Sequence, residues 1–178
     1  MIAEAIGDVA RSKVGGSLMA KKAVRIVLVG MGRAAGRDEA RRSVATAIHF
    51  VALSEGGKQV MAKDEVREVL VAMGLAARSD DTRWWIASAI GHLSAGTVGG
   101  RVMAKDEVRE VLVAMGRDAE GDEAKERIAI AICSVSRSAD GWRVMARDDV
   151  RAILAAIWRD AECGVSRRWI SILLGREG

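Results

Sequence analysis

Apolar side chains along this chain follow the period of an α-helix. In the stretch DEVREVLVAMG, residues 64–74, four apolar positions share one helix face with i, i+3, i+4, i+7 spacing: Val66, Val69, Leu70 and Met73. The stretch DDTRWWIASAIGHLSA, residues 80–95, has a second stripe of this kind, and the shorter GGKQVMA, residues 56–62, precedes both. The pattern therefore predicts one short helix followed by two longer ones.

The same pattern returns every 42 residues without insertion. The stretch VMAKDEVREVLVAMG occupies residues 60–74 and, unchanged, residues 102–116. A methionine marks the same place in each copy: Met19, Met61, Met103 and Met145. We expect a single domain, residues 1–178, in which the last helix of an incomplete unit precedes four units: 1–13, then 14–55, 56–97, 98–139 and 140–178.

No single unit can bury both of its apolar stripes, but units stacked side by side can. The β-branched residues cost roughly a few tenths of a kcal/mol each in a helix, whereas burying an apolar side chain returns roughly 1.5–3 kcal/mol. The sequence therefore predicts an all-α protein. At single residues it predicts Asp64 and Asp80 as N-caps and Gly74 as a left-handed C-cap.

The stretch VRIVLVGMGRAAG, residues 24–36, could also be interpreted as a dinucleotide-binding loop, since Gly30, Gly32 and Ala35 have G-x-G-x-x-A spacing. Alanine replaces Gly30 in the other units: Ala72, Ala114 and Ala156. The acidic residue that such a fold needs after its second strand is also missing, because a predicted core helix follows instead. We therefore expect no cofactor, and a helix that ends at Gly32.

The predicted third helix of each unit resembles that of armadillo-repeat proteins, a family of right-handed α-solenoids. The likeness lies in alternating Ala and Ile or Leu, and three stretches carry it: SVATAIHFVAL (43–53), WIASAIGHLSA (85–95) and RIAIAICSVSR (127–137). It spans essentially the whole chain. The resemblance implies a right-handed α-solenoid of 42-residue units whose third helices line a concave groove, and two-helix HEAT-type repeats remain the alternative.

The resemblance also implies a function, with one departure. Peptide-binding armadillo proteins carry a Trp and an Asn four residues apart on the third helix, and this chain lacks that ladder, so recognition of nuclear-localisation signals is not carried over. Varying columns on the same helix remain the candidates for partner contacts: Thr46, Phe50, Trp84, Ser88, His92, Ile130 and Ser134. We expect a non-enzymatic scaffold that binds an extended peptide or protein segment there. Trp84 or Trp85 could equally pack on a neighbouring unit.

Two repeated cationic columns offer a second hypothesis. One lies in the predicted second helices, at Arg25, Arg67, Arg109 and Arg151; the other lies in the first turn of the third helices, at Arg41, Arg83, Lys125 and Arg167. A cation in a first turn opposes the helix dipole. Either these residues pair with carboxylates of the preceding unit, or they bind an acidic or phosphorylated partner. An RNA- or phosphate-binding solenoid is thus the alternative function, and a purely structural, self-assembling repeat is a third.

No catalytic or metal-binding constellation emerges from the sequence. His49 and His92 stand in non-equivalent columns without a Cys or Asp at ligand spacing, and are expected on the helix surface. Carboxylate pairs such as Asp80 and Asp81 stand at helix starts, where capping explains them. We expect no enzyme, no metal and no cofactor.

Composition and charge narrow the picture further. Half of the residues are apolar but only 3% are aromatic, and the formal net charge of +4 is mild for a nucleic-acid binder. Cys133 and Cys163 are expected to be reduced thiols. The opening MIAEAIGDVARSK lacks a charged region followed by an apolar one, so no signal peptide is expected there. No apolar run approaches the ~20 residues that cross a bilayer. A cytoplasmic or nuclear location without a membrane partner is expected.

The first residues are predicted to leave apolar side chains uncovered. Ile2, Ile6 and Val9 would lie at an open end of the stack, where solenoids normally carry a polar cap. We expect either a longer array or a homo-oligomer formed through this end.

Overall fold

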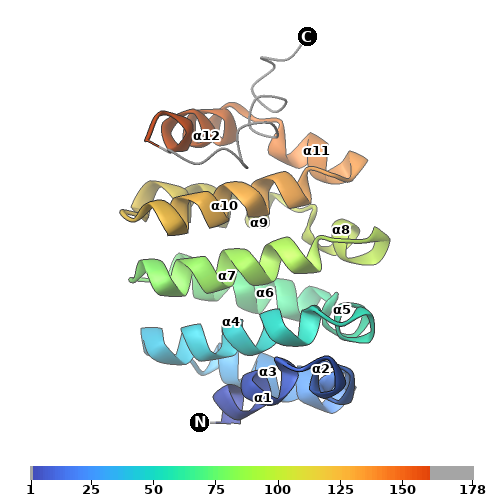
Figure 1. The fold of residues 1–178 in the computed structure, drawn as a ribbon. Helices are drawn as coiled ribbons and strands as arrows, with labels where there is room; N and C mark the ends of the chain where they lie inside the picture. The colour runs from blue at the N-terminus through green and yellow to red at the C-terminus, as the bar shows by residue number, and fades with distance from the viewer. Residues whose placement is uncertain (1, 161–178) are drawn as a thin grey trace.

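The computed structural model describes residues 2–160, and every regular element in that range is an α-helix (Figure 1). The short helices are α2 (Lys13–Met19), α5 (Glu55–Met61), α8 (Thr97–Met103) and α11 (Ala139–Met145). The second helices are α3 (Lys22–Arg33), α6 (Asp64–Leu75), α9 (Asp106–Asp118) and α12 (Asp148–Asp160). The third helices are α1 (Ile2–Ala10), α4 (Asp38–Ala52), α7 (Asp80–Leu93) and α10 (Asp122–Val135). Within each class, successive helices from α2 onward begin 42 residues apart.

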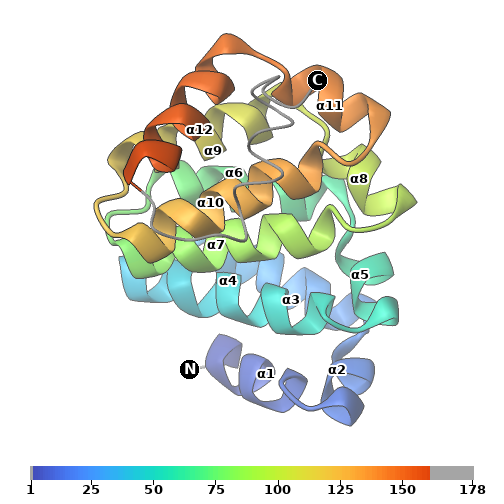
Figure 2. The same cartoon turned by 45° about the horizontal axis from the view of Figure 1, so that its top comes forward.

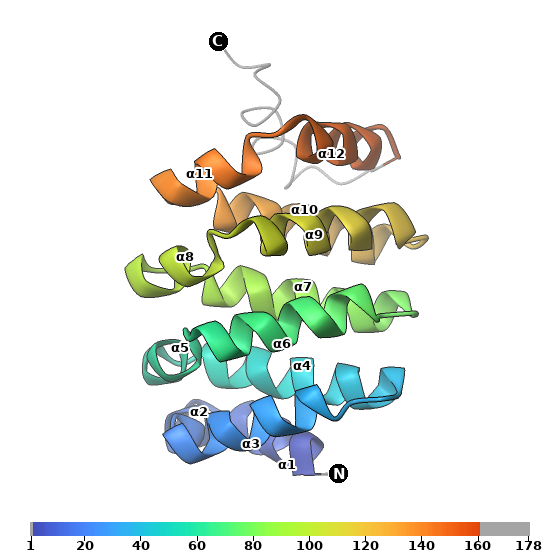
Figure 3. The same ribbon diagram turned by 180° about the vertical axis from the view of Figure 1, so that it is seen from behind.

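The helices form two layers with the short helices along one side. A front layer holds α1, α4, α7 and α10 in that order (Figure 1), and a back layer holds α3, α6, α9 and α12 (Figure 3). Each helix of a layer packs on the equivalent helix of the next unit. Figure 2 shows the short helices beside the ends of the front-layer helices.

The core lies between the layers, on the apolar stripes that the sequence predicts. Leu70 of α6 and Ile86 and Ile90 of α7 are fully buried, and α6 and α7 are in contact. Each such side chain contributes roughly 1.5–3 kcal/mol of burial. Packing between layers therefore outweighs the weak helix propensity of the β-branched residues.

A column of glycines lets neighbouring back-layer helices approach closely. The predicted C-cap at Gly74 is wrong, because α6 continues to Leu75 and Gly74 is buried inside it; Gly32 is likewise internal to α3. A Cβ on Gly74 would lie 2.5 Å from Cγ2 of Val111, which α9 contributes. The same overlap would arise between Gly32 and Val69, and a close contact between Gly116 and Ile153. Each glycine thus forms a notch that receives a branched side chain of the next unit.

A second glycine column positions the short helices. A Cβ on Gly57 would overlap the carbonyl oxygen of Val51 at the end of α4, and Gly15, Gly99 and Gly141 meet the equivalent oxygens. The Ser54 hydroxyl accepts a hydrogen bond from the Gly57 N–H at 3.0 Å. The third helix of one unit and the short helix of the next are therefore joined at a fixed angle.

Acidic residues predicted as N-caps have a different role in the structure. The N-cap of α7 is Ser79, whose side chain accepts from Thr82, and the N-cap of α6 is Lys63. Asp80 instead accepts hydrogen bonds from the Glu120 and Gly121 N–H groups at the start of the next unit's third helix. The prediction was wrong for Asp80 because its carboxylate accepts from N–H groups across the unit boundary rather than from those of its own helix. It was wrong for Asp64 because that carboxylate pairs with Arg67.

Asp38 makes the same link one unit earlier. It accepts hydrogen bonds from the backbone N–H groups of Arg78 and Ser79, at 3.0 and 2.9 Å, and from the Ser79 hydroxyl at 2.6 Å. Desolvation raises the pKa of Asp38, but these hydrogen bonds outweigh it and lower the pKa from 3.8 to about 2.

Arginines of the second helices also connect successive units. Arg25 pairs with Glu65 of α6 at 3.1 Å, and the same contact recurs one and two units later, from Arg67 to Glu107 and from Arg109 to Asp149. The expected partner in the preceding unit is therefore wrong for this column: the carboxylate comes from the following unit.

We expect Gly74→Ala to lower the free energy of unfolding by about 1–3 kcal/mol, because its Cβ overlaps Val111 and neither backbone can withdraw freely. Gly30→Ala is the matched control, since a Cβ on Gly30 has nothing within 4 Å. At low protein concentration that substitution should raise the free energy of unfolding by up to about 1 kcal/mol, because alanine has a higher helix propensity than glycine. Denaturant unfolding of both variants measures the difference, and equal effects would contradict the notch.

We expect Asp38→Asn to lower the free energy of unfolding by about 2 kcal/mol at pH 7, since the asparagine cannot carry the charge that the Arg78 and Ser79 N–H groups stabilise. Because the folded pKa lies below the ordinary value, this stabilisation is complete above about pH 4 and disappears as the pH falls to about 2. Asp140→Asn, at an exposed first-turn aspartate, is the control. A difference that persists at pH 2 would refute the assignment.

Candidate functional site

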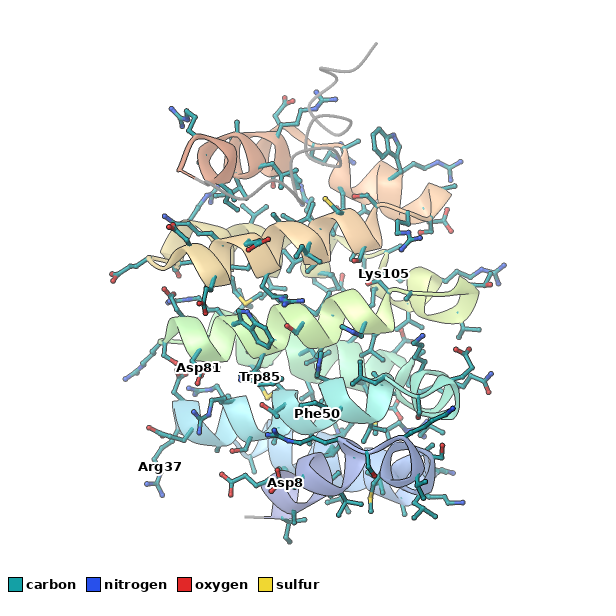
Figure 4. The ribbon with its side chains drawn as sticks, viewed as in Figure 1. Asp8, Arg37, Phe50, Asp81, Trp85 and Lys105 are labelled. Carbon is teal, nitrogen blue, oxygen red and sulfur yellow. The ribbon has the colours of Figure 1, made fainter. Side chains whose placement is uncertain are left out.

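The candidate groove residues lie on the front layer. An aromatic cluster, two arginines that lie over its rings and two hollows occur together there. Figure 4 shows Asp8, Phe50, Asp81 and Trp85 on this face, contributed by α1, α4 and α7. Successive front-layer helices are in contact, so side chains of different units come within reach of one another.

Five rings from α4 and α7 form one aromatic cluster: His49, Phe50, Trp84, Trp85 and His92. His49 contacts the other four rings. The ring centroid of Trp85 lies 5.7 Å from Phe50, 5.4 Å from His49 and 4.6 Å from Trp84. Edge-to-face pairs of this kind contribute about 0.5–1.5 kcal/mol beyond burial. Both tryptophans and Phe50 remain half-buried, so the cluster is ordered by packing yet still partly open to a partner.

Two arginines lie over rings of the cluster. The guanidinium of Arg127, from α10, lies 4.4 Å from the Trp84 centroid, and that of Arg11 lies 4.7 Å from Phe50. Contacts of this kind are worth about 0.5–1 kcal/mol where exposed. The rings of this face therefore already accept guanidinium groups from the chain itself.

The two histidines form the inner edge of the cluster, with centroids 4.5 Å apart. His49 is buried and its Nδ1 has no hydrogen-bond partner among the described residues. Burial lowers the pKa of His49 to about 4, and the neighbouring His92 and Arg127 act in the same direction. Burial also lowers the pKa of His92, whose Nδ1 lies 3.1 Å from the Ser88 carbonyl oxygen. Both imidazoles are therefore neutral at pH 7.

Two hollows flank Trp85. One, of about 460 Å³, is the acidic hollow, and its lining includes Asp80, Asp81, Trp84, Trp85, Asp122 and Glu123. No cationic side chain of the described residues lines it. The other, of about 420 Å³, is the mixed hollow; its lining includes Glu4, Asp8, Arg11, Arg42, Thr46 and Trp85. In the mixed hollow the charges are paired, because Arg42 contacts Asp81 at 2.9 Å and Arg11 contacts Asp8 at 3.4 Å.

The structure brings some of the predicted groove residues together and separates others. Phe50, Trp84 and His92 belong to the aromatic cluster, and Thr46 lines the mixed hollow. Ser88 is buried beneath the cluster. On α10, the Ser134 hydroxyl donates to the Ile130 carbonyl at 2.8 Å, and both residues are half-buried outside the ring contacts.

Sequence reasoning missed His49 and Arg127 and left Trp85 undecided. The expectation of a surface position for His49 is wrong, since the residue is buried. Phe50 meets Trp85, 35 positions later, and His49 meets His92, 43 positions later, so no single column contains the cluster. Comparing each residue with those one unit ahead, up to about two helical turns to either side, would have found it.

The basic column of the third helices is engaged within the fold. Arg41 contacts Asp38 at 3.4 Å and Arg83 contacts Asp80 at 2.8 Å, each in its own helix rather than in the preceding unit. Arg83 also donates to the Ala77 carbonyl and is buried. Lys125 has an interaction of its own, and Arg167 lies outside the described residues.

Comparison with known protein families, characterised proteins and solved structures finds no match to this chain. Within residues 2–160, no group of three or more His, Cys, Asp or Glu side chains is placed to hold a metal ion. No helix of that range has the length and apolar character that a bilayer crossing requires.

We expect the protein to lose about 2–3 kcal/mol of unfolding free energy between pH 6.5 and pH 4 through His49. Its folded pKa lies below its ordinary value, so the unfolded chain takes up the proton first and acid favours unfolding in that range. His49→Phe keeps a ring and sacrifices no hydrogen bond of Nδ1. Denaturant unfolding at both pH values should show a smaller loss in this variant, and an unchanged loss would place the titration elsewhere.

Proposed function

We propose that this chain is a right-handed α-solenoid of armadillo-like units that acts as a non-enzymatic protein-interaction scaffold. The organisation is supported by three classes of helix that recur at a 42-residue interval and by two layers of equivalent helices. The presence of a short helix in every described unit favours three-helix armadillo-like units over two-helix HEAT-type units.

The partner in this proposal is an extended peptide or protein segment on the front layer. The supporting observation is the half-buried aromatic cluster between the acidic and mixed hollows. Tryptophan is enriched among residues that dominate binding energy, because it buries a large rigid surface. An extended segment crossing α4, α7 and α10 would meet Phe50, Trp85 and Trp84 in turn.

The charge of the acidic hollow favours a cationic side chain on that segment. Two indole rings line it with four carboxylates, of which Asp80 and Asp81 pair with Arg83 and Arg42. Asp122 and Glu123, beside the rings, provide the combination that a guanidinium or ammonium group binds through ion pairing and cation–π contact. Arg127 over Trp84 is an example of this contact within the chain. We therefore place an arginine or lysine of the partner in the acidic hollow, in place of the acidic segment that the basic columns suggested.

The alternative function, binding RNA or phosphate through Arg41 and Arg83, has less support. Both guanidinium groups contact aspartates of their own helices, and Arg83 is buried. Binding a phosphate there would require breaking these ion pairs, which disfavours this alternative.

A fluorescein-labelled peptide of alternating arginine and glycine tests the proposal by fluorescence polarisation. We expect it to bind more tightly than the matched glutamate–glycine peptide. Asp122→Asn/Glu123→Gln should weaken binding at least about tenfold, because it removes two of the carboxylates of the acidic hollow. Trp85→Ala should weaken it as well, since Trp85 lines both hollows.

The matched control is Glu55→Gln/Asp140→Asn, which removes the same charge from α5 and α11. Equal loss in this control would mean that net charge alone attracts the peptide. Circular dichroism separates loss of binding from unfolding in each variant. A labelled oligouridine that binds where the arginine peptide does not would overturn the proposal in favour of nucleic acid.

A further inference from the structure

Exposed large apolar side chains concentrate at one end of the described molecule. Leu53, Leu75, Val98 and Trp142 are scattered along the rest of the described chain. The remaining exposed large apolar residues all belong to α1, α2 and α3: Ile2, Val9, Val14, Leu18, Ile26 and Val27. Figure 3 shows these three helices together at one end of both layers. We call this surface the α1–α3 end face.

Three of these side chains stand at positions that are buried in the next unit. Ile2, Val9 and Val27 are 64%, 44% and 41% exposed, whereas their equivalents Val44, Val51 and Val69 are 1%, 0% and 3% exposed. The preceding unit covers Val44, Val51 and Val69 through α1 and α3. The end face thus has the side chains of an inter-unit interface without a covering neighbour among the described residues.

The exposed side of α3 has a branched side chain and a glycine, the two residue types that meet between units, here with the glycine at position 30 rather than in the Gly32 column. Between units, a branched side chain such as Val69 fills the notch of a glycine such as Gly32. On the end face, Val27 is exposed, and three positions later Gly30 is exposed with nothing within 4 Å of a Cβ built on it. Residues three apart lie on the same side of a helix. The other units have alanine at the position of Gly30.

This face is not suited to another unit of the same kind. Between units, an arginine pairs with a carboxylate of the following second helix, as Arg25 does with Glu65. The residue of α3 equivalent to Glu65 is Ala23, and the equivalent of Glu68 is Ile26. A preceding unit would leave its arginine without that carboxylate, whereas an apolar neighbour would cover Ala23 and Ile26.

We propose that the α1–α3 end face binds a second copy of this chain about a twofold axis, with the two α3 helices antiparallel. In this arrangement Val27 of each copy fills the notch at Gly30 of the other, since a twofold interface pairs residue i with j and j with i. The same register places Ala23 opposite Ala34, so small residues let the helices approach closely. Ile26 of both copies is covered at the centre of the seam.

Sedimentation equilibrium of the full chain over a range of concentrations tests the dimer. We expect a mass that rises with concentration from the 19.0 kDa of the monomer to twice that value. Gly30→Val should yield monomers, because two valines then meet at each contact. The double variant Val27→Gly/Gly30→Val exchanges the branched side chain and the notch. It should restore the dimer, because position 27 of each copy faces position 30 of the other.

Leu75→Glu, at an exposed residue of α6, is the control and should leave the dimer intact. Added KCl should strengthen association, because Lys22 approaches Arg33 of the other copy in this register. A single mass of 19.0 kDa at every concentration would overturn the proposal, as would a dimer that Gly30→Val leaves unchanged. Circular dichroism of each variant excludes unfolding as the cause of monomer formation.

Discussion

Neighbouring units pack as closely as they do because glycine stands at two fixed places in each of the units 14–55, 56–97 and 98–139. At Gly32, Gly74 and Gly116 the missing Cβ receives a valine or isoleucine of the next second helix. At Gly57 and its equivalents it lets a short helix begin directly against the preceding third helix. Overpacking such contacts costs about 1–3 kcal/mol each, and the contact repeats along the stack. The spacing of successive units along the stack depends on these two columns.

Polar contacts between units depend on the same register. Arg25, Arg67 and Arg109 each reach a carboxylate 40 positions later. Asp38 and Asp80 reach N–H groups 40 and 41 positions later. Inserting one residue in a unit would turn the following helix by about 100° and misplace both kinds of contact. A constant unit length is therefore a physical requirement of this packing, and it agrees with the absence of insertions in the repeated pattern.

Periodicity in the sequence predicted the helices and their 42-residue interval, because helix faces are a local property of the chain. It placed Gly74 at a helix end and Asp80 at an N-cap, and both were wrong for one reason. The partner of each residue, Val111 for the glycine and the Gly121 N–H for the aspartate, belongs to the next unit. In the candidate site, Phe50, Trp84 and His92 were predicted from columns that vary. His49 and Arg127 were missed because their contacts join different columns.

The candidate site lies where the regular packing of the front layer changes. One column reads Gly7, His49, Gly91 and Cys133. A Cβ on Gly7 would lie 3.6 Å from Ala47 Cα, and one on Gly91 would lie 3.5 Å from Ala131 Cα, so α1 meets α4, and α7 meets α10, at backbone distance. Between α4 and α7 the equivalent residue is His49, whose imidazole contacts the rings of Trp85 and His92. Of the contacts α1–α4, α4–α7 and α7–α10, only α4–α7 has a ring in place of this glycine. The aromatic cluster therefore forms there, and the two hollows lie on either side of it.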